Sequence, residues 1–138
     1  IRVYAVEKNP EALELIRENR KRFPTDGIRI ISGEAPEVLK ALEPPTHLFI
    51  GGSSGNLKEI LSCAIEKNGQ VRIVINAISL ETVKEVMEAV EGGLLRHPEI
   101  TQLSVSRSRE LGRYHMMTGQ NPVYIISSGG NSAERGDT

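Results

Sequence analysis

Short apolar runs alternate with amphipathic runs from Ile1 to Glu91. A short apolar run rich in β-branched residues is typical of a strand that is covered on both faces of a parallel sheet. The strands predicted in this way are Ile1–Val6, Ile28–Ile31, His47–Ile50 and Val71–Ile75. The repeated strand–helix order predicts an α/β fold, in which right-handed helical crossovers join mostly parallel strands.

The segments between these strands carry apolar residues at helical spacing. Asn9 and Pro10 predict the start of the first helix, and Pro36 opens a short second one. The strongest helical pattern follows Gly55, and Ser79 can cap another helix. The predicted inner faces are Leu13, Ile16 and Phe23 in the first helix, Leu57, Ile60, Leu61, Ala64 and Ile65 after Gly55, and Leu80, Val83, Met87 and Val90 after Ser79.

The last part of the chain changes character. Ile100–Ser108 alternates apolar and polar residues, and Val123–Ile126 is a second apolar run with no helix between the two. This order predicts an antiparallel hairpin with a long connection, which makes the sheet mixed. We therefore expect one domain over residues 1–127 and a polar, flexible tail over residues 128–138.

Composition narrows the classes of function. The chain has 138 residues, enough for one domain, and a formal net charge of -1. Aromatic residues make up only 4% of the chain, so neither charge nor composition favours nucleic-acid binding. No apolar run is long enough to span a membrane, and the single cysteine, Cys63, excludes an intrachain disulfide. We expect a cytoplasmic protein that does not bind membranes, and the scattered histidines give no reason to expect a metal site.

Ligands of open parallel sheets bind beyond the carboxyl ends of the strands. Glu7 ends the first strand, where a carboxylate can accept hydrogen bonds from both hydroxyls of a ribose. The alternative is that Glu7 only favours the helix that starts at Asn9, through the helix dipole. Gly33, Glu34 and Ala35 end the second strand, where backbone N–H groups can reach an adenine edge or simply form an ordinary turn.

The segment Gly51-Gly52-Ser53-Ser54-Gly55 ends the third strand and opens a helix. Its glycines let the main chain approach a ligand, and the helix N-terminus favours a carboxylate or another anion. The same segment matches the nucleophile elbow of α/β-hydrolases, with Ser53 as nucleophile. Such a triad needs an acid and then a histidine after the serine. His97 lies in a connection beside Pro98, and no aspartate lies between Ser53 and His115, so a glutamate would have to supply the acid. A Ser53 hydrolase is therefore the weaker alternative.

Two further groups of polar residues are candidates for ligand binding. Asn76 ends the fourth strand, where its amide can orient a substrate or cap a turn. Arg107, Arg109 and Arg113 gather around the first tail strand. Arginine forks bind carboxylates in pairs, so this cluster suits a polyanionic small molecule. Its other interpretation is an edge strand that charge protects against aggregation.

Several of these segments resemble the class I S-adenosylmethionine-dependent methyltransferases, and in particular the decarboxylating C15-methyltransferases of corrin synthesis. Val3–Glu7 followed by Asn9-Pro10 resembles the ribose-binding motif of the class. The more specific similarity is carried by Phe49–Leu57, Val74–Ala77, Leu80–Thr82, Gly112–Met116 and Gln120–Val123.

The resemblance implies a Rossmann-like fold, S-adenosyl-L-methionine as cofactor and a tetrapyrrole corrin precursor as substrate. It implies cofactor contacts at Glu7, Lys8, Glu34, Ala35 and Gly51, and it names no catalytic residue. It implies substrate contacts at Gly52, Ser53, Ser54, Gly55, Asn76, Arg107, Arg109 and Arg113. The reaction it implies is methylation at C15 with loss of carbon dioxide from an acetate side chain.

One departure from the family concerns the start of the chain. The family's first strand and its glycine-rich loop precede the segment that begins at Ile1, so we expect the natural chain to begin earlier and the sheet to have a gap between the strands ending at Glu7 and Gly51. An inactive methyltransferase-like binding module is therefore an alternative function. The alternating tail strands also predict a homo-oligomer.

Overall fold

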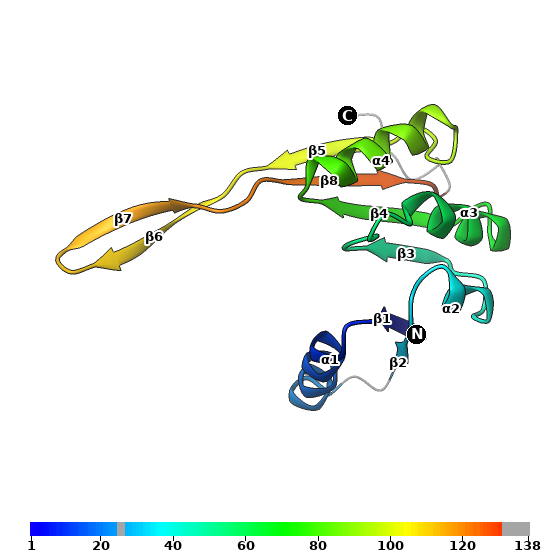
Figure 1. Cartoon of the computed structure of the whole chain (residues 1–138), viewed down its shortest axis with the longest axis horizontal. Coiled ribbons are helices and arrows are strands. Elements are labelled where there is room, and N and C mark those ends of the chain that lie inside the picture. The colour runs from blue at the N-terminus through cyan, green and yellow to red at the C-terminus, as the bar shows by residue number, and fades with distance from the viewer. Residues whose placement is uncertain (25–26, 131–138) are drawn as a thin grey trace. The chain divides into compact units, whose positions relative to one another are not determined.

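The computed structural model describes residues 1–24 and 27–130 (Figure 1). The predicted tail over residues 128–138 therefore lies outside the described residues, except for its first three positions. The helices are α1 (Pro10–Arg22), α2 (Glu37–Lys40), α3 (Leu57–Lys67) and α4 (Leu80–Glu91). The strands are β1 (Val3–Glu7), β2 (Ile28–Ser32), β3 (His47–Ile50), β4 (Arg72–Ala77), β5 (Glu99–Leu103), β6 (Ser106–Leu111), β7 (Tyr114–Gly119) and β8 (Val123–Ser128).

The chain divides into two compact units, Ile1–Glu43 and Pro44–Thr138. In the first unit β1 and β2 pair in parallel, as the strand–helix order predicts, and α1 connects them. Asn9 caps α1, because its Oδ1 accepts hydrogen bonds from the N–H groups of Glu11 and Ala12 at 2.9 and 3.4 Å. The predicted inner face of α1 is only partly correct: Leu13 is buried, but Phe23 ends the helix with 63% of its surface exposed.

The second unit contains a four-stranded mixed sheet in the order β3-β4-β8-β5. β3 and β4 are parallel, whereas β8 runs antiparallel to both β4 and β5. The predicted mixed sheet is thus confirmed. The gap that the family resemblance predicts between the strands ending at Glu7 and Gly51 stays a prediction.

Helices α3 and α4 lie against the four-stranded sheet and contact each other (Figure 1). The predicted inner face of α3 is confirmed, since Leu57, Ile60, Leu61 and Ala64 are all buried. Strand residues beneath the helices complete the core, and Ile73, Ile75, Ala77 and Ile126 each keep 2% or less of their surface exposed.

The predicted inner face of α4 is only partly correct, since Val83 and Val90 are half-buried. Leu80 and Met87 are 77% and 42% exposed, whereas the residues that the structure buries are Val86 and Ala89. Ala89 is 3% exposed although it has the smallest side chain of the helix's apolar residues. The buried face of the helix therefore differs in part from the one that its larger apolar residues indicate.

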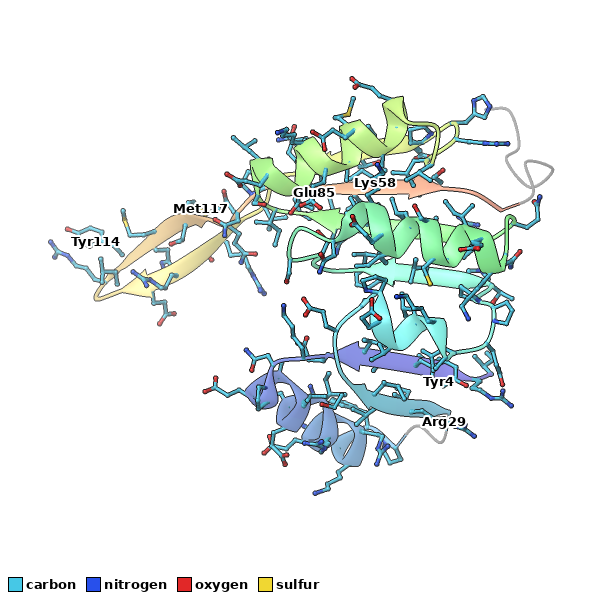
Figure 2. All side chains as sticks on the ribbon, turned by 45° about the vertical axis from the view of Figure 1, so that its right-hand side comes forward. Tyr4, Arg29, Lys58, Glu85, Tyr114 and Met117 are labelled. Carbon is cyan, nitrogen blue, oxygen red and sulfur yellow. The ribbon has the colours of Figure 1, made fainter. Side chains whose placement is uncertain are left out.

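The tail strands differ from the prediction in their bounds. The predicted strand Ile100–Ser108 is interrupted after Leu103, so its second half belongs to β6, which pairs with β7 in a separate hairpin. This hairpin fills the long connection between β5 and β8 and extends beyond the sheet of the second unit (Figure 1). All residues of β6 and β7 are exposed, including Tyr114 and Met117, which Figure 2 labels. β8 ends at Ser128, two residues beyond its predicted end.

The turn after β8 provides a test of the packing. Gly129 has a φ of +83°, and a Cβ atom there would lie 2.1 Å from the carbonyl oxygen of Val71. Gly130 has a similar φ of +76°, but its nearest neighbours would be 3.9 Å away. We expect Gly129→Ala to lower the free energy of unfolding by about 3 kcal/mol and Gly130→Ala by about 1 kcal/mol, because only the first adds a backbone clash to the cost of a left-handed L-residue. Urea unfolding measures both, and equal losses would contradict the close approach at Gly129.

Candidate functional site

The carboxyl ends of β1 and β2 bring together the predicted nucleoside-binding residues of the first unit. The N–H of Gly33 donates to the carbonyl oxygen of Glu7 at 3.0 Å, so the parallel pairing continues to the ends of both strands. The ammonium group of Lys8 pairs with Glu34 Oε1 at 2.7 Å. Glu7, Lys8, Glu34 and Ala35 thus belong to one edge of the first unit.

One carboxylate oxygen of half-buried Glu7 accepts hydrogen bonds from the neighbouring backbone. Glu7 Oε1 accepts hydrogen bonds from the N–H groups of Lys8 and Asn9, both at 2.8 Å. These contacts fix the carboxylate just before α1, as the helix-start interpretation of Glu7 requires. No described residue donates a hydrogen bond to Oε2, so this oxygen can accept one from a ligand.

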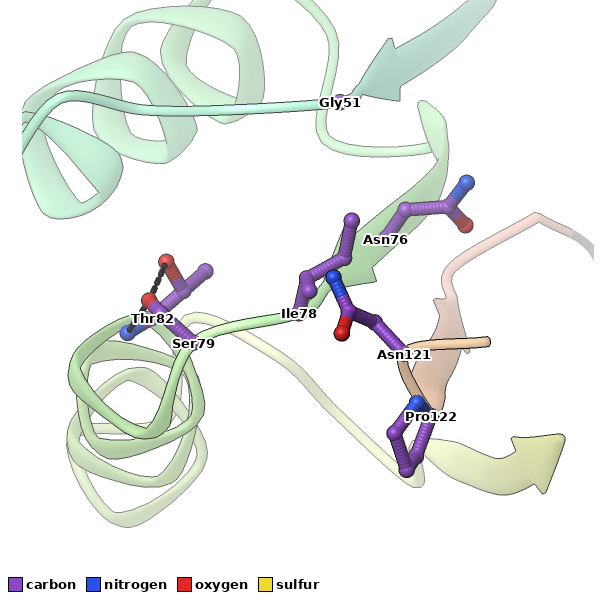
Figure 3. Close-up of a pocket in the computed structure, with 7 residues that line it drawn as sticks. All are labelled: Gly51, Asn76, Ile78, Ser79, Thr82, Asn121 and Pro122. Carbon is purple, nitrogen blue, oxygen red and sulfur yellow. Dashed lines mark hydrogen bonds between the residues drawn. The ribbon is translucent and has the colours of Figure 1, made fainter. Parts of the chain in front are cut away.

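The second unit has a pocket of about 440 Å³ at the carboxyl ends of β3 and β4. Gly51 contributes from the end of β3, Asn76 from β4, and Ser79 and Thr82 from the first turn of α4 (Figure 3). The lining is completed by Ile78, Asn121 and Pro122. No charged side chain belongs to this lining, so hydrogen bonds from amides and hydroxyls are its polar chemistry.

The first turn of α4 is capped by a side chain where it reaches the pocket. Ser79 caps the helix, since its Oγ accepts a hydrogen bond from Thr82 N–H at 3.1 Å and lies 3.0 Å from Thr82 Oγ1 (Figure 3). Asn76 is the penultimate residue of β4, and the strand continues two residues beyond the predicted end at Ile75, to Ala77. The amide of Asn76 is therefore held by a paired strand, not by a turn.

The loop between β3 and α3 is held by an acidic residue of α4. Glu85 Oε2 accepts hydrogen bonds from the hydroxyl of Ser53 at 3.4 Å and from the N–H of Leu57 at 3.2 Å. Ser53 is 6% exposed, and the N–H of Asn56 donates to its carbonyl oxygen at 2.9 Å. The anion predicted at the N-terminus of α3 is therefore supplied by the protein itself.

The predicted arginine cluster lies on the β6–β7 hairpin. Arg107 and Arg109 alternate with serines along β6, so their side chains share one face, with Thr118 and Met116 opposite them on β7. Arg113 is in the turn, where its guanidinium lies 5.2 Å from the centre of the Tyr114 ring and donates to the Tyr114 hydroxyl at 3.1 Å. Two of the three arginines are thus brought together on one surface.

Comparison with known proteins places these features in a family. Residues 1–128 match the family model described as a precorrin methyltransferase domain. The chain belongs to this family. It is 40% identical over 128 residues to a probable cobalt-precorrin-6B C(15)-methyltransferase (decarboxylating) of Pyrobaculum calidifontis, covering 92% of the chain and 65% of that relative.

Solved structures agree with this assignment. A precorrin-6y C5,15-methyltransferase from Geobacter metallireducens matches with a TM-score of 0.83 and 35% identity, over 93% of the chain and 68% of that structure. A SAM-dependent O-methyltransferase from Thermotoga maritima matches in fold alone, with a TM-score of 0.65 at 12% identity, over 99% of the chain and 52% of that structure. The predicted Rossmann-like, class I methyltransferase fold is confirmed.

Membership in the precorrin methyltransferase family, together with the structure, argues against the Ser53 hydrolase. A nucleophile elbow exposes its serine at the top of a strained turn. Ser53 is buried instead, and the positive φ angles of the loop are those of the next two residues, Ser54 at +52° and Gly55 at +85°. His97 precedes β5 and His115 lies on β7, and the acceptor of the Ser53 proton is a carboxylate, not an imidazole.

Sequence reasoning missed several residues of the site. Ser79, Thr82, Ile78, Asn121 and Pro122 line the pocket but were not among the predicted binding residues. A signal was available for Asn121 and Pro122, because they directly precede β8, whose start lies at the same edge of the sheet as the end of β4. Glu85 offered no such signal, since it is an acidic residue in the middle of a helix.

Two structural properties bear on other classes of site. None of the helices in the described ranges is both long and apolar enough to cross a membrane. Across the same residues, no group of three or more histidine, cysteine, aspartate or glutamate side chains is arranged to hold a metal ion.

Proposed function

We propose that the protein catalyses S-adenosylmethionine-dependent C-methylation of a corrin precursor of the precorrin-6Y type, at C15, with decarboxylation of an acetate side chain. The observation that carries the proposal is the family match over residues 1–128, together with 40% identity to a relative named as a decarboxylating C(15)-methyltransferase. The chain spans 65% of the length of that relative.

The first unit supplies residues that fit the nucleoside of S-adenosylmethionine. Glu7 Oε2 is an available acceptor for a ribose hydroxyl, and its partner oxygen is fixed by two backbone N–H groups. Lys8, Glu34 and Ala35 belong to the same edge and stay predicted cofactor contacts. Gly51, in the second unit, is a further contact that the family resemblance predicts. When bound, the cofactor supplies an electrophilic methyl group on a sulfonium.

The pocket of the second unit supports binding of the methyl acceptor. Its volume of about 440 Å³ is in the range of small-molecule sites. Asn76 and Asn121 present amides that can hydrogen-bond ring substituents, and Gly51 lets the main chain come close. Because the leaving group is already activated, the work of these residues is to position the acceptor carbon. Loss of carbon dioxide leaves its bonding electrons in the conjugated ring, so the reaction needs no protein nucleophile.

The carboxylates of a corrin precursor need partners outside this uncharged pocket. We assign them to Arg107 and Arg109, which share a face of the hairpin, and to Arg113 in its turn. Gly52, Ser54 and Gly55 are exposed on the β3–α3 loop and stay predicted substrate contacts. For Ser53 only a contact through its backbone fits, because its hydroxyl is already bonded to Glu85.

The arginine assignment is tested by replacing Arg107 and Arg109 together with glutamine. We expect the KM for the corrin precursor to rise about tenfold at low salt, as the loss of charge-assisted hydrogen bonds requires, and the difference to shrink at high salt. Arg72→Gln is the matched control, because Arg72 is an exposed arginine at the opposite end of the sheet, where β4 begins. An unchanged KM in the double variant would favour the edge-protection interpretation instead.

The exposed hairpin also supports the proposal that the protein is a homo-oligomer. Leu111, Tyr114, Met116 and Met117 are each at least half exposed on it, which is an unusual concentration of large apolar side chains for a free surface. A second copy of the chain is the occupant that we propose. Sedimentation equilibrium of the whole chain measures the association, and a monomer at all concentrations would reject it.

The proposed reaction is tested directly by product analysis. The whole chain is incubated with a corrin precursor and S-adenosylmethionine carrying an isotopic label in its methyl group. We expect a product that has gained one labelled methyl group and lost one carbon dioxide. A folded chain that binds S-adenosylhomocysteine but transfers no label to any corrin precursor would reject the proposed substrate class.

A further inference from the structure

We infer that Glu85 is a positioning residue that locks together the two walls of the acceptor pocket, the β3–α3 loop and helix α4. This inference rests on the proposed function, because it assigns to Glu85 a role in placing the corrin precursor. Glu85 is not part of the pocket lining, and its contact with the proposed substrate-binding residues is the hydrogen bond from Ser53.

The N–H groups at the start of α3 are not capped by the side chain of the preceding residue. Asn56 occupies the N-cap position, but its side chain makes no capping hydrogen bond to the helix. The first N–H groups of a helix lack partners within the helix and need an external acceptor. Glu85 provides that acceptor to Leu57 N–H, at 3.2 Å, from a different helix.

The same carboxylate oxygen also holds the middle of the loop. Glu85 Oε2 accepts a hydrogen bond from the Ser53 hydroxyl, so one atom ties two points of the segment that begins with pocket residue Gly51. Between these points lie Ser54 and Gly55, whose positive φ values of +52° and +85° form the bend of the loop. A loop held on both sides of its bend has few alternative conformations.

The position of Glu85 on α4 connects this anchor to the other wall. Thr82, which lines the pocket, is one helical turn before Glu85, so the two residues lie on the same side of α4. Figure 2 labels Glu85 between α4 and α3. The carboxylate therefore fixes the separation of the Gly51 wall from the Ser79–Thr82 wall, and with it the width of the pocket.

A negative charge at the start of α3 has a second consequence. The N-terminus of a helix is a favourable place for an anion, and Glu85 already fills it. Glu85 thereby disfavours a substrate carboxylate at the first N–H groups of α3, so the predicted contacts at Gly52, Ser54 and Gly55 are with uncharged parts of the corrin precursor. The uncharged lining of the pocket agrees with this assignment.

The experiment compares Glu85→Ala and Glu85→Gln in the whole chain. Glutamine keeps a carbonyl oxygen that can accept both hydrogen bonds, whereas alanine removes them. Glu88→Ala is the control, because Glu88 is exposed one turn further along α4 and pairs with Lys84 at 3.7 Å. Amide hydrogen exchange at residues 51–57 reports on the loop, steady-state kinetics on the acceptor, and calorimetry with S-adenosylhomocysteine on cofactor binding.

We expect Glu85→Ala to speed exchange of the Leu57 amide about tenfold or more, as loss of a hydrogen bond to a charged group predicts. We expect the KM for the corrin precursor to rise about tenfold, while the affinity for S-adenosylhomocysteine falls no more than about threefold, because Gly51 is the single predicted cofactor contact on this loop. Glu85→Gln should restore the KM and the exchange rate to within about threefold of wild type, and Glu88→Ala should change neither.

Other results would overturn the inference. Unchanged exchange at Leu57 in Glu85→Ala would show that the carboxylate does not hold the loop. A parallel loss of acceptor and cofactor binding, not rescued by glutamine, would indicate a merely structural role. If Glu85→Ala does not fold, Ser53→Ala removes one of the two hydrogen bonds, and it must raise loop exchange and KM in the same direction. A wild-type chain without turnover would reject the proposed function, while the exchange measurements still decide whether Glu85 anchors the loop.

Discussion

Replacing Glu7 with alanine is expected to weaken the binding of S-adenosylhomocysteine about 10- to 100-fold. Hydrogen bonds to a charged group contribute about 1.5–3 kcal/mol, and each 1.4 kcal/mol corresponds to a factor of about ten in affinity. The carboxylate is prepared for this role, because Lys8 N–H and Asn9 N–H hold one oxygen and leave the other to the ribose. Calorimetric titration of the whole chain measures the change.

The control for this prediction is Glu11→Ala. Glu11 is an exposed acid in the first turn of α1, so it shares the favourable interaction with the helix dipole but does not stand at the end of β1. If Glu7 serves only the start of the helix, both substitutions should lower stability slightly and neither should change ligand affinity. Equal affinities in wild type, Glu7→Ala and Glu11→Ala would refute the ribose assignment.

The largest effect on stability is expected for Leu61→Ala. Leu61 is fully buried in α3, at the interface with the sheet of the second unit, and truncation of such a leucine costs about 2–5 kcal/mol through lost burial and the cavity left behind. Leu80→Ala is the matched control on α4, where 77% of the leucine surface is exposed, and we expect a loss below about 0.5 kcal/mol. Urea unfolding followed by circular dichroism compares the two.

This pair of leucines also tests which helix face the structure assigns to the core. The periodicity of α4 predicts that Leu80 is buried, whereas the structure exposes it. A loss for Leu80→Ala as large as that for Leu61→Ala would contradict the orientation of α4. A small loss would confirm that Val86 and Ala89 form its buried face.

Sequence reasoning succeeded where one local pattern determines the structure. The apolar residues of α3 form a single stripe along the helix, which stops at its C-cap residue Asn68. Only the face that carries this stripe can be buried. The α4 sequence instead offers apolar residues on a wider arc, and which part of that arc is buried depends on how the helix packs in the folded protein. That choice is a property of the packed molecule, which periodicity does not contain.

The β6–β7 hairpin was missed for a different reason. Both of its faces are exposed, so its strands lack the alternation that burial of one face imposes. Its turn did carry a signal, because Gly112, with a φ of +59°, and Arg113 form a two-residue loop of the kind that closes hairpins. A search for glycine-containing two-residue turns would have predicted a tight hairpin centred on this loop, with a strand that continues past Ser108 to Leu111.

Some residues of the candidate site are visible in the local sequence, whereas others are brought to it only by tertiary packing. Glu7 and Asn76 could be predicted because strand ends are visible in the sequence and ligands gather there. Glu85 could not, because its partners Ser53 and Leu57 belong to another helix and its loop, and only tertiary packing brings them together. Asn121 likewise reaches the pocket only through the antiparallel pairing of β8 with β4.

The central claim is that the carboxyl ends of β1 and β2 bind the nucleoside of the methyl donor. It is tested most directly by titrating the isotope-labelled whole chain with S-adenosylhomocysteine and following its amide signals by nuclear magnetic resonance. The account predicts saturable shifts at Lys8, Asn9 and residues 33–35, with little change at the exposed surface of α1. Absence of any shift at millimolar ligand, or shifts confined to the β6–β7 hairpin, would contradict it.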